Sequence, residues 1–192
     1  MTLSADNPIE MRYQNGVHVS YLAQLLEDPA LWNQHRLRTT REGPHRHVDD
    51  IWVRCLDWGV MRERPEMFNQ PHESSWYPVA HNELHEAKSI AGAIMQVVGG
   101  KELGGVLITR IPAGCCVLPH VDEGWHARAH RKFAVQIQAN DLQEFCFEKK
   151  RLVTRPGDVF EFDNQYSHWV TNPSSEPRVT MIVCVRREPS NG

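Results

Sequence analysis

The pattern of apolar and polar residues changes from helical to strand-like near residue 102. Before that point, Ser20 as an N-cap predicts a short helix over 20–27. Apolar residues on one stripe predict a second helix over about 82–98. A short apolar run over 50–55 predicts one strand in this half of the chain.

From residue 103 onward, short segments rich in β-branched and aromatic residues alternate with turn residues. In one of them Phe133, Val135 and Ile137 share one side, whereas the other side is mainly polar. Strands are expected at 105–111, 132–139, 144–147, 151–154, 159–162, 167–171 and 178–185. Short strands at this spacing predict an antiparallel sandwich or barrel, covered on one face by the earlier helices.

The chain of 192 residues contains no internal repeat, low-complexity tract or obvious linker. We therefore expect a single domain over 1–192. Within it, residues 1–102 would form a helical and irregular shell, and residues 103–187 would form the β core.

Charge and composition indicate which partners and which cell compartment to expect. A formal net charge of −3 gives no reason to expect nucleic acid or an anionic membrane as partner. No apolar run approaches the roughly 20 residues needed to span a bilayer, and the N-terminus lacks the pattern of a signal peptide. The five cysteines are an odd number without a CxxC pair, which is typical of reduced thiols and predicts a cytoplasmic protein. No motif predicts a particular oligomeric state.

Eleven histidines direct attention to metal binding. Iron(II) that activates oxygen is commonly held by two histidines and one carboxylate on one octahedral face. The motif His120-Val-Asp122 supplies two such ligands together, because residues i and i+2 of an extended segment point the same way. The motif is not unique, since His47-Val-Asp49 has the same form and His81-Asn-Glu83 is a carboxylate variant.

The remaining ligand decides between these motifs. His168 begins a predicted strand downstream of the first motif, and Arg178 follows ten residues later. A guanidinium can hold the distal carboxylate of 2-oxoglutarate through a bidentate pair, and Thr180 shares the face of Arg178. No such combination follows His47 at a comparable spacing, and His81 lies where a helix is predicted, so the first motif is favoured.

The run PHVD…RKFAVQIQAN…RPGDVFEFDNQYSHWVTN…PRVTMIVCV resembles the aspartyl/asparaginyl β-hydroxylase-like branch of the 2-oxoglutarate-dependent oxygenases. The resemblance covers about residues 104–186. Its features are Pro119-His120, whose histidine is the first ligand, then Gly157-Asp158, Phe162-Asp163-Asn164 before the distal histidine, Asn172 and Arg178.

The resemblance implies a mainly β (α+β) fold, a double-stranded β-helix of jelly-roll or cupin-like type, with N-terminal helices packed on one face. It implies Fe(II) held by His120, Asp122 and His168, with 2-oxoglutarate and O2 as cosubstrates. The better-studied animal hydroxylases of this branch have no carboxylate at the position of Asp122. Its presence here argues against a halogenase, in which halide takes that place.

The resemblance also suggests further contacts to 2-oxoglutarate. Arg178 and Thr180 are the expected anchors, and Lys132 and Gln136 are candidates on the polar side of their strand. Relatives often carry arginine and histidine on this strand, whereas the corresponding positions here are Lys132 and Ala134.

The polar segment 123–131 lies between the first two ligands and the next strand. We expect it to be a loop beside the metal, with Trp125, His126 and Arg128 as candidate substrate contacts. His45 and His47 could face the pocket, but a loop held by local hydrogen bonds is the favoured interpretation.

The activity implied is hydroxylation of a C–H bond with release of succinate and CO2. The resemblance suggests a small polar substrate: an aspartyl or asparaginyl residue of a peptide, a free amino acid or a related metabolite. Two alternatives stay open, a metal-dependent cupin-like enzyme without oxygen chemistry and a metal-free binding module. Arg178 favours the oxygenase, because the alternatives need no anchor for 2-oxoglutarate.

Overall fold

The strands of the protein form two antiparallel sheets. A computed structural model describes residues 3–36, 38–39 and 42–187. Within these residues, the larger sheet has the strand order β1-β9-β6-β11-β4-β2-β3, and the smaller sheet has the order β5-β10-β7-β8. The larger sheet consists of β1 (Ile9–Tyr13), β9 (Val159–Phe162), β6 (His130–Gln138), β11 (Arg178–Arg186), β4 (Leu103–Ile111), β2 (Asp49–Cys55) and β3 (Ser75–Trp76). The smaller sheet consists of β5 (Cys116–His120), β10 (His168–Thr171), β7 (Glu144–Phe147) and β8 (Arg151–Val153).

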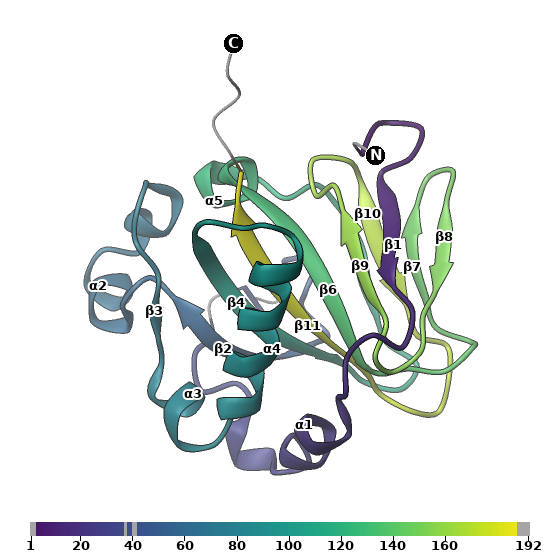
Figure 1. The fold of residues 1–192 in the computed structure, drawn as a ribbon, viewed down its shortest axis with the longest axis horizontal. Helices are drawn as coiled ribbons and strands as arrows, with labels where there is room; N and C mark the ends of the chain where they lie inside the picture. The colour runs from purple at the N-terminus through teal and green to yellow at the C-terminus, as the bar shows by residue number, and fades with distance from the viewer. Residues whose placement is uncertain (1–2, 37, 40–41, 188–192) are drawn as a thin grey trace.

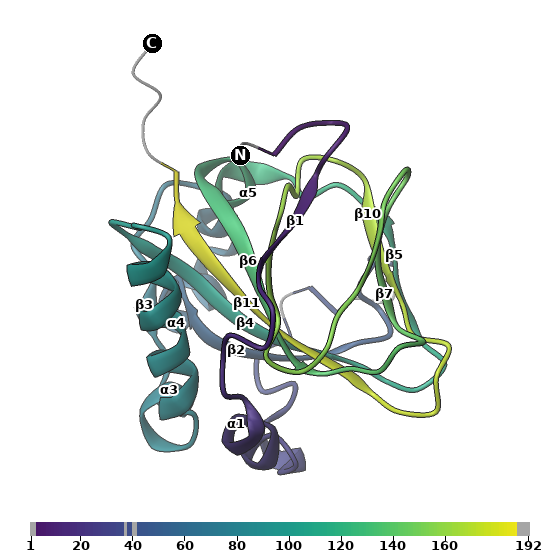
Figure 2. The same cartoon turned by 45° about the vertical axis from the view of Figure 1, so that its right-hand side comes forward.

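The two sheets lie face to face like the walls of a flattened barrel (Figure 2). From β4 onward the chain passes back and forth between them: β4, β6, β9 and β11 belong to the larger sheet, and β5, β7, β8 and β10 to the smaller one. This alternation is the double-stranded β-helix, or jelly roll, and it confirms the predicted fold class.

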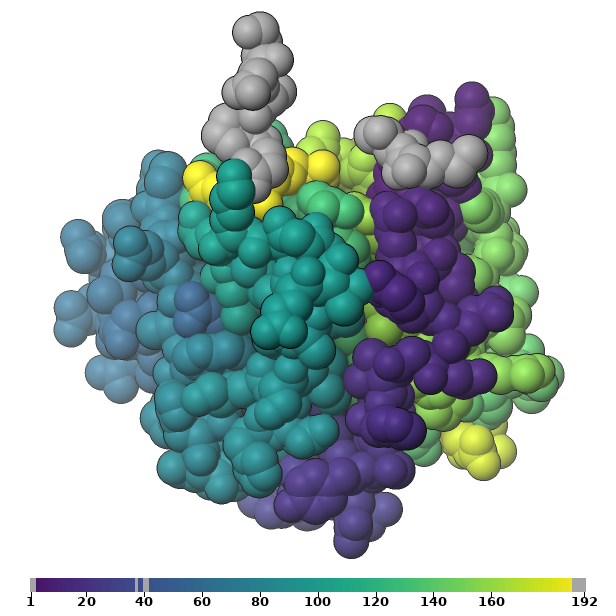
Figure 3. All heavy atoms as spheres, in the orientation of Figure 1, coloured from purple at the N-terminus to yellow at the C-terminus, as the bar shows by residue number. Residues whose placement is uncertain are grey.

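Helices from the N-terminal half cover the outer face of the larger sheet (Figure 1). Leu22, Ile90 and Ile94 belong to one buried cluster with Val135 and Met181 of the sheet. Figure 3 shows the same face, which residues of the N-terminal half largely cover. The helices are α1 (Ser20–Leu25), α2 (Trp58–Glu63), α3 (Pro78–Asn82), α4 (His85–Val97) and α5 (Gly124–Ala129), with 3-10 turns η1 (Pro29–Leu31) and η2 (Pro65–Asn69). Among the described residues, no helix has both the length and the apolar character to cross a membrane.

The N-terminal half contains more regular secondary structure than the sequence pattern suggested. Besides the expected strand β2, it adds β1 and β3 to the larger sheet. The helix expected over 82–98 begins at His85, because Leu84 leaves the helical region at φ −117° and ψ 42°. The first helix is capped by Val19 rather than Ser20, and no side chain bonds to its free N–H groups.

Candidate active site

A cavity of about 360 Å³ opens between the two sheets. Its floor is the inner face of the larger sheet, where strand register places Thr109 beside Thr180 and Leu107 beside Ile182. Lys132 of β6 lines the same cavity. Alternate residues of neighbouring strands therefore face one space, opposite the helix-covered side.

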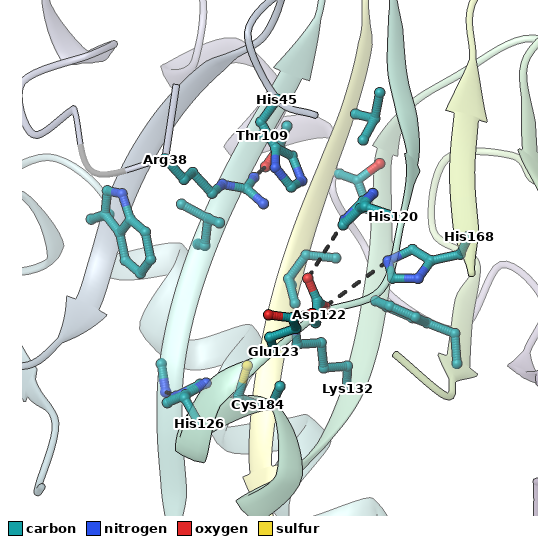
Figure 4. A pocket seen from close by; sticks show the side chains of 18 of the residues that line it. Arg38, His45, Thr109, His120, Asp122, Glu123, His126, Lys132, His168 and Cys184 are labelled. Carbon is teal, nitrogen blue, oxygen red and sulfur yellow. Dashed lines mark hydrogen bonds and ion pairs between the residues drawn. The ribbon is translucent and has the colours of Figure 1, made fainter. Parts of the chain in front are cut away.

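The smaller sheet brings two histidines together above this floor. His120 at the end of β5 is the register partner of His168 at the start of β10. Their ring centroids lie 4.4 Å apart, and both residues line the cavity (Figure 4). Strand pairing alone therefore joins two side chains that are distant in sequence.

Hydrogen bonds fix the roles of the ring nitrogens. Nδ1 of His120 lies 2.8 Å from the carbonyl oxygen of Leu118, and Nδ1 of His168 lies 2.9 Å from that of Tyr166. A carbonyl oxygen only accepts, so each Nδ1 carries the hydrogen and each Nε2 offers a lone pair. Burial lowers the pKa of His168 to about 4, which keeps this ring neutral at neutral pH. Such support is typical of histidines that bind metals.

The third member of the group is Asp122, whose backbone N–H donates to the carbonyl oxygen of Asn164. Its Oδ1 lies 3.5 Å from Nε2 of His120, and its Oδ2 lies 4.0 Å from Nε2 of His168. Burial alone would raise the pKa of Asp122. The ammonium of Lys132, 2.5 Å from Oδ2, and the two histidines instead hold it well below its usual range. The carboxylate is therefore ionised and ready to bind a cation.

The donor atoms of His120, Asp122 and His168 all lie within 4.8 Å of one another, and no other such group occurs among the described residues. Two neutral imidazoles and one carboxylate are the donor set suited to Fe(II). The competing motif does not converge on a metal site, since His47 is exposed and Asp49 pairs with Arg110.

Arg178 lies on the inner face of β11, two positions before Thr180, and is only 1% exposed. Its Nη2 donates to the hydroxyl of Thr154 at 3.1 Å. Its Nε and Nη1 are buried without a partner among the described residues. Burial lowers the pKa of Arg178 to about 10, so the group still carries its charge at neutral pH. A buried, partly unpaired guanidinium fits the distal carboxylate of 2-oxoglutarate.

The other predicted cosubstrate residues occupy different surroundings. Thr180 and Lys132 line the cavity. Gln136 is fully buried, and its Nε2 donates to the carbonyl oxygens of Gln138 and Val179. Its Oε1 accepts from the hydroxyls of Thr154 and Thr180. These bonds join β6 to β11, so Gln136 contributes to the support of the site rather than to its lining.

The segment expected as a polar loop contains the helix α5, which is a correction to the prediction. Of its three candidates, His126 lines the cavity. Its Nε2 accepts from the N–H of Gly105 at 3.3 Å, and burial lowers its pKa to about 2. Trp125 instead packs beside His72, and Arg128 is exposed.

Sequence reasoning missed residues of the N-terminal half that line the cavity. His45 lies in a loop, as expected, but its ring meets that of His120 edge-on at 4.6 Å. Arg38 and Trp52 also line the cavity. The segment carrying Arg38 and His45 has no regular pattern, so no periodicity pointed to it.

Comparisons with known proteins agree with this geometry. A family model described as Aspartyl/Asparaginyl beta-hydroxylase matches residues 57–188, which include the whole segment that carries the resemblance. No curated protein sequence matches the chain.

Solved structures are similar in fold. A 2OG-Fe(II) oxygenase family oxidoreductase from Burkholderia pseudomallei superposes with a TM-score of 0.61 at 12% identity, covering 94% of this chain and 86% of that chain. A prolyl hydroxylase from Trichoplax adhaerens, in complex with a hypoxia inducible factor peptide fragment, gives 0.60 at 11% identity, covering 94% and 84%. A Pseudomonas putida prolyl-4-hydroxylase gives 0.53 at 14% identity, covering 95% and 94%. At such low identity these likenesses show the jelly-roll fold.

Proposed function

The chain belongs to the aspartyl/asparaginyl β-hydroxylase family and is a hydroxylase dependent on Fe(II), 2-oxoglutarate and O2, and from this premise we propose how its own residues serve the reaction. His120, Asp122 and His168 hold the iron, and Arg178 holds the distal carboxylate of 2-oxoglutarate. The substrate is a small polar molecule: an aspartyl or asparaginyl residue, a free amino acid or a related metabolite.

The observation that carries this proposal is the convergence of the three donors in one cavity. Both imidazoles have their Nδ1 atoms bonded to carbonyl oxygens, which directs Nε2 to a ligand. The carboxylate of Asp122 completes a set with two neutral ligands and one charge, so an Fe(II) ion would keep a net charge of +1 for anionic cosubstrate.

When bound, the iron, 2-oxoglutarate and O2 supply the oxidising chemistry, in which a substrate C–H becomes C–OH while 2-oxoglutarate becomes succinate and CO2. The protein's part is to orient the cosubstrate and the substrate and to exclude water from the site. Arg178, buried and partly unpaired, would provide directional donors for the distal carboxylate of 2-oxoglutarate. Apolar side chains such as Phe145 and Val170 line the space nearby and limit solvent.

The test is an anaerobic titration of purified protein with Fe(II) and 2-oxoglutarate. A weak visible charge-transfer band is expected, and it should disappear in His168→Ala. His47→Ala is the matched control, because it removes an exposed histidine of the competing motif. If wild-type protein gives no band, or if the band survives in His168→Ala, a non-oxygenase metal enzyme or a metal-free binding module becomes the better assignment.

A further inference from the structure

The cavity extends beyond the metal donors into a region walled by the N-terminal half of the chain. Met61 of α2 and Phe68 of η2 line this region, together with Trp52 of β2 and Leu107 of β4. Trp52 is the register partner of Leu107, so the two side chains lie next to each other on the inner face of the sheet. The wall is therefore mainly apolar and aromatic.

One permanent cation lies at the edge of this apolar wall. Arg38 lines the cavity, and Figure 4 shows its guanidinium directed toward the space in front of His45 and His120. Its Nε and Nη2 donate to the two carboxylate oxygens of Asp50 at 2.9 and 3.0 Å, and Nη2 also donates to the hydroxyl of Thr109. Asp50 is buried, so the guanidinium is held in one orientation before any ligand arrives.

These bonds use two of the three guanidinium nitrogens. Nη1 of Arg38 has no hydrogen-bond partner among the described residues, and it is the nitrogen left to meet a ligand. Because Asp50 already balances much of the charge, recognition here would depend on directional hydrogen bonds more than on net attraction.

A second unpaired donor lies two residues from Asp50 on the same face of β2. Trp52 is 8% exposed, and its indole Nε1 is buried without a hydrogen-bond partner among the described residues. A buried indole N–H usually finds an acceptor. Arg38 thus offers Nη1 beside an apolar wall, which suits a ligand with acceptor oxygens and an apolar body. Trp52 lines the same cavity, and its buried Nε1 would meet a ligand oxygen after a small shift of the ring.

This donor pair is separate from the 2-oxoglutarate anchor assigned above. Arg178 starts β11 opposite Ile111 of β4, whereas Arg38 sits on Asp50 and Thr109 toward the N-terminal wall. One guanidinium is therefore available for the cosubstrate and another for a second anion. The cavity of about 360 Å³ is near the lower end of the roughly 300–1,000 Å³ found for ligand sites, which favours small molecules.

We propose that Arg38 and Trp52 bind the carboxylate of the substrate, and that the substrate is a free carboxylic acid whose apolar body packs on Met61 and Phe68. This assignment rests on the proposed hydroxylase function, and it replaces the small polar substrate proposed there with a carboxylic acid that has an apolar body. Amino acids with large apolar side chains and alkyl or aryl carboxylic acids share this chemistry. An internal aspartyl residue of a peptide carries a carboxylate but no large apolar body, and an asparaginyl residue has neither.

Binding can be measured without turnover, with Mn(II) in place of iron and 2-oxoglutarate present under anaerobic conditions. The probes are L-leucine, L-phenylalanine, hexanoate and phenylacetate, and each acid is compared with its primary amide. Calorimetry measures the affinity of each probe. At least one acid should bind on the order of tenfold or more tighter than its amide, since the amide loses the charge-assisted bonds to Arg38. Equal binding of acids and amides, or binding of aspartyl and asparaginyl peptides alone, would overturn the assignment.

Two variants locate the contact. Arg38→Gln should weaken binding of that acid on the order of tenfold or more, and Trp52→Phe, which keeps an aromatic ring, by several-fold. Arg110→Gln is the matched control, because Arg110 pairs with Asp49 on the same two strands but outside this cavity. Affinity for 2-oxoglutarate should stay within about twofold in all three variants, which also reports that they fold. Unchanged acid binding in both Arg38→Gln and Trp52→Phe would refute the assignment.

The same titrations distinguish a failure of the proposed substrate class from a failure of the proposed hydroxylase site. Wild-type protein that binds no 2-oxoglutarate with Mn(II) would contradict the hydroxylase site itself. Protein that binds 2-oxoglutarate but none of the acids would contradict the substrate class and leave the hydroxylase site in place.

Discussion

His120 and His168 are direct partners across the β5–β10 strand pair, with ring centroids 4.4 Å apart. Each ring is held through Nδ1 by the carbonyl oxygen of the residue two positions earlier in the chain. The two halves of the histidine pair are thus built in the same way on neighbouring strands. A metal site formed like this needs little rearrangement to bind its ion.

Removing one ligand should therefore remove the metal site without unfolding the sheet. In His168→Ala, affinity for Mn(II) should fall by more than about 100-fold, because changing even a residue that only supports a ligand costs about 10–100-fold. Titration followed by the electron paramagnetic resonance of free Mn(II) measures this. His47→Ala should bind Mn(II) as the wild type does. Equal affinity in His168→Ala would show that the three donors do not act together.

Arg178 should be required for 2-oxoglutarate yet unfavourable for the stability of the protein without it. Arg178→Met should weaken 2-oxoglutarate binding by about 10–100-fold, the value of hydrogen bonds to a charged group. Without 2-oxoglutarate, the variant should melt at the same or a higher temperature, because Nε and Nη1 are buried and unpaired.

Calorimetry and thermal melts measure the two effects. Arg155→Met is the control, since Arg155 is exposed and pairs with exposed Asp141. A large loss of stability in Arg178→Met without 2-oxoglutarate would mean that Nε and Nη1 also have partners in the protein, besides the bond from Nη2 to Thr154.

Glu161 should make stability depend on pH on the acidic side. Burial would raise the pKa of Glu161, but Arg131 and Arg12, which both donate to its carboxylate, lower it below the ordinary value of 4.5. A carboxyl with a lowered folded-state pKa stabilises the protein above the unfolded-state value and loses this effect as pH falls through the folded-state value. Glu161→Gln should therefore cost about 1–3 kcal/mol at pH 7, where two arginines lose their partner.

The difference between wild type and Glu161→Gln should shrink as the pH is lowered below about 4.5. Urea unfolding at a series of pH values measures it. Glu148→Gln is a suitable control, because Glu148 is exposed. A difference that stays constant from pH 7 to pH 3 would assign the effect to packing rather than to the ion pairs.

The β core could be predicted well from the sequence, because its turn residues and its alternation of apolar and polar residues agree with the strands of the fold. The strands 144–147 and 159–162 are found at their expected bounds. Polar turns separate them from their neighbours, and the predicted alternation of β6 is real: Val135 faces the helices and Lys132 faces the cavity. The three candidate metal donors could be chosen because spacing and resemblance pointed to the same residues, which the structure brings within 4.8 Å of one another.

Elements that depend on distant contacts were missed. β1 (Ile9–Tyr13) is an edge strand whose partner β9 lies about 150 residues further along the chain. α5 has no side-chain cap at its start, and it is held by packing, with His126 stacked on Phe68 at 6.3 Å. Arg38 has no local pattern at all, and it becomes informative only when Asp50 and Thr109 are seen to hold it.

The ammonium of Lys132 lies 2.5 Å from Oδ2 of Asp122, one of the three candidate metal donors. A cation at this position competes with a metal ion for the same carboxylate and repels it. The predicted contact between this cation and 2-oxoglutarate would attract the cosubstrate. Removing the cation should therefore change the two affinities in opposite directions.

In Lys132→Met, Mn(II) should bind about tenfold more tightly, and 2-oxoglutarate should bind about tenfold more weakly to the Mn(II)-loaded protein. Sequential titration of the two ligands measures both values on one sample. Lys149→Met serves as the control, since Lys149 is exposed and pairs with exposed Asp6 rather than with Asp122. If Mn(II) instead binds more weakly to Lys132→Met, the lysine orients the carboxylate for the metal, and its closeness to Asp122 is a support rather than a competition.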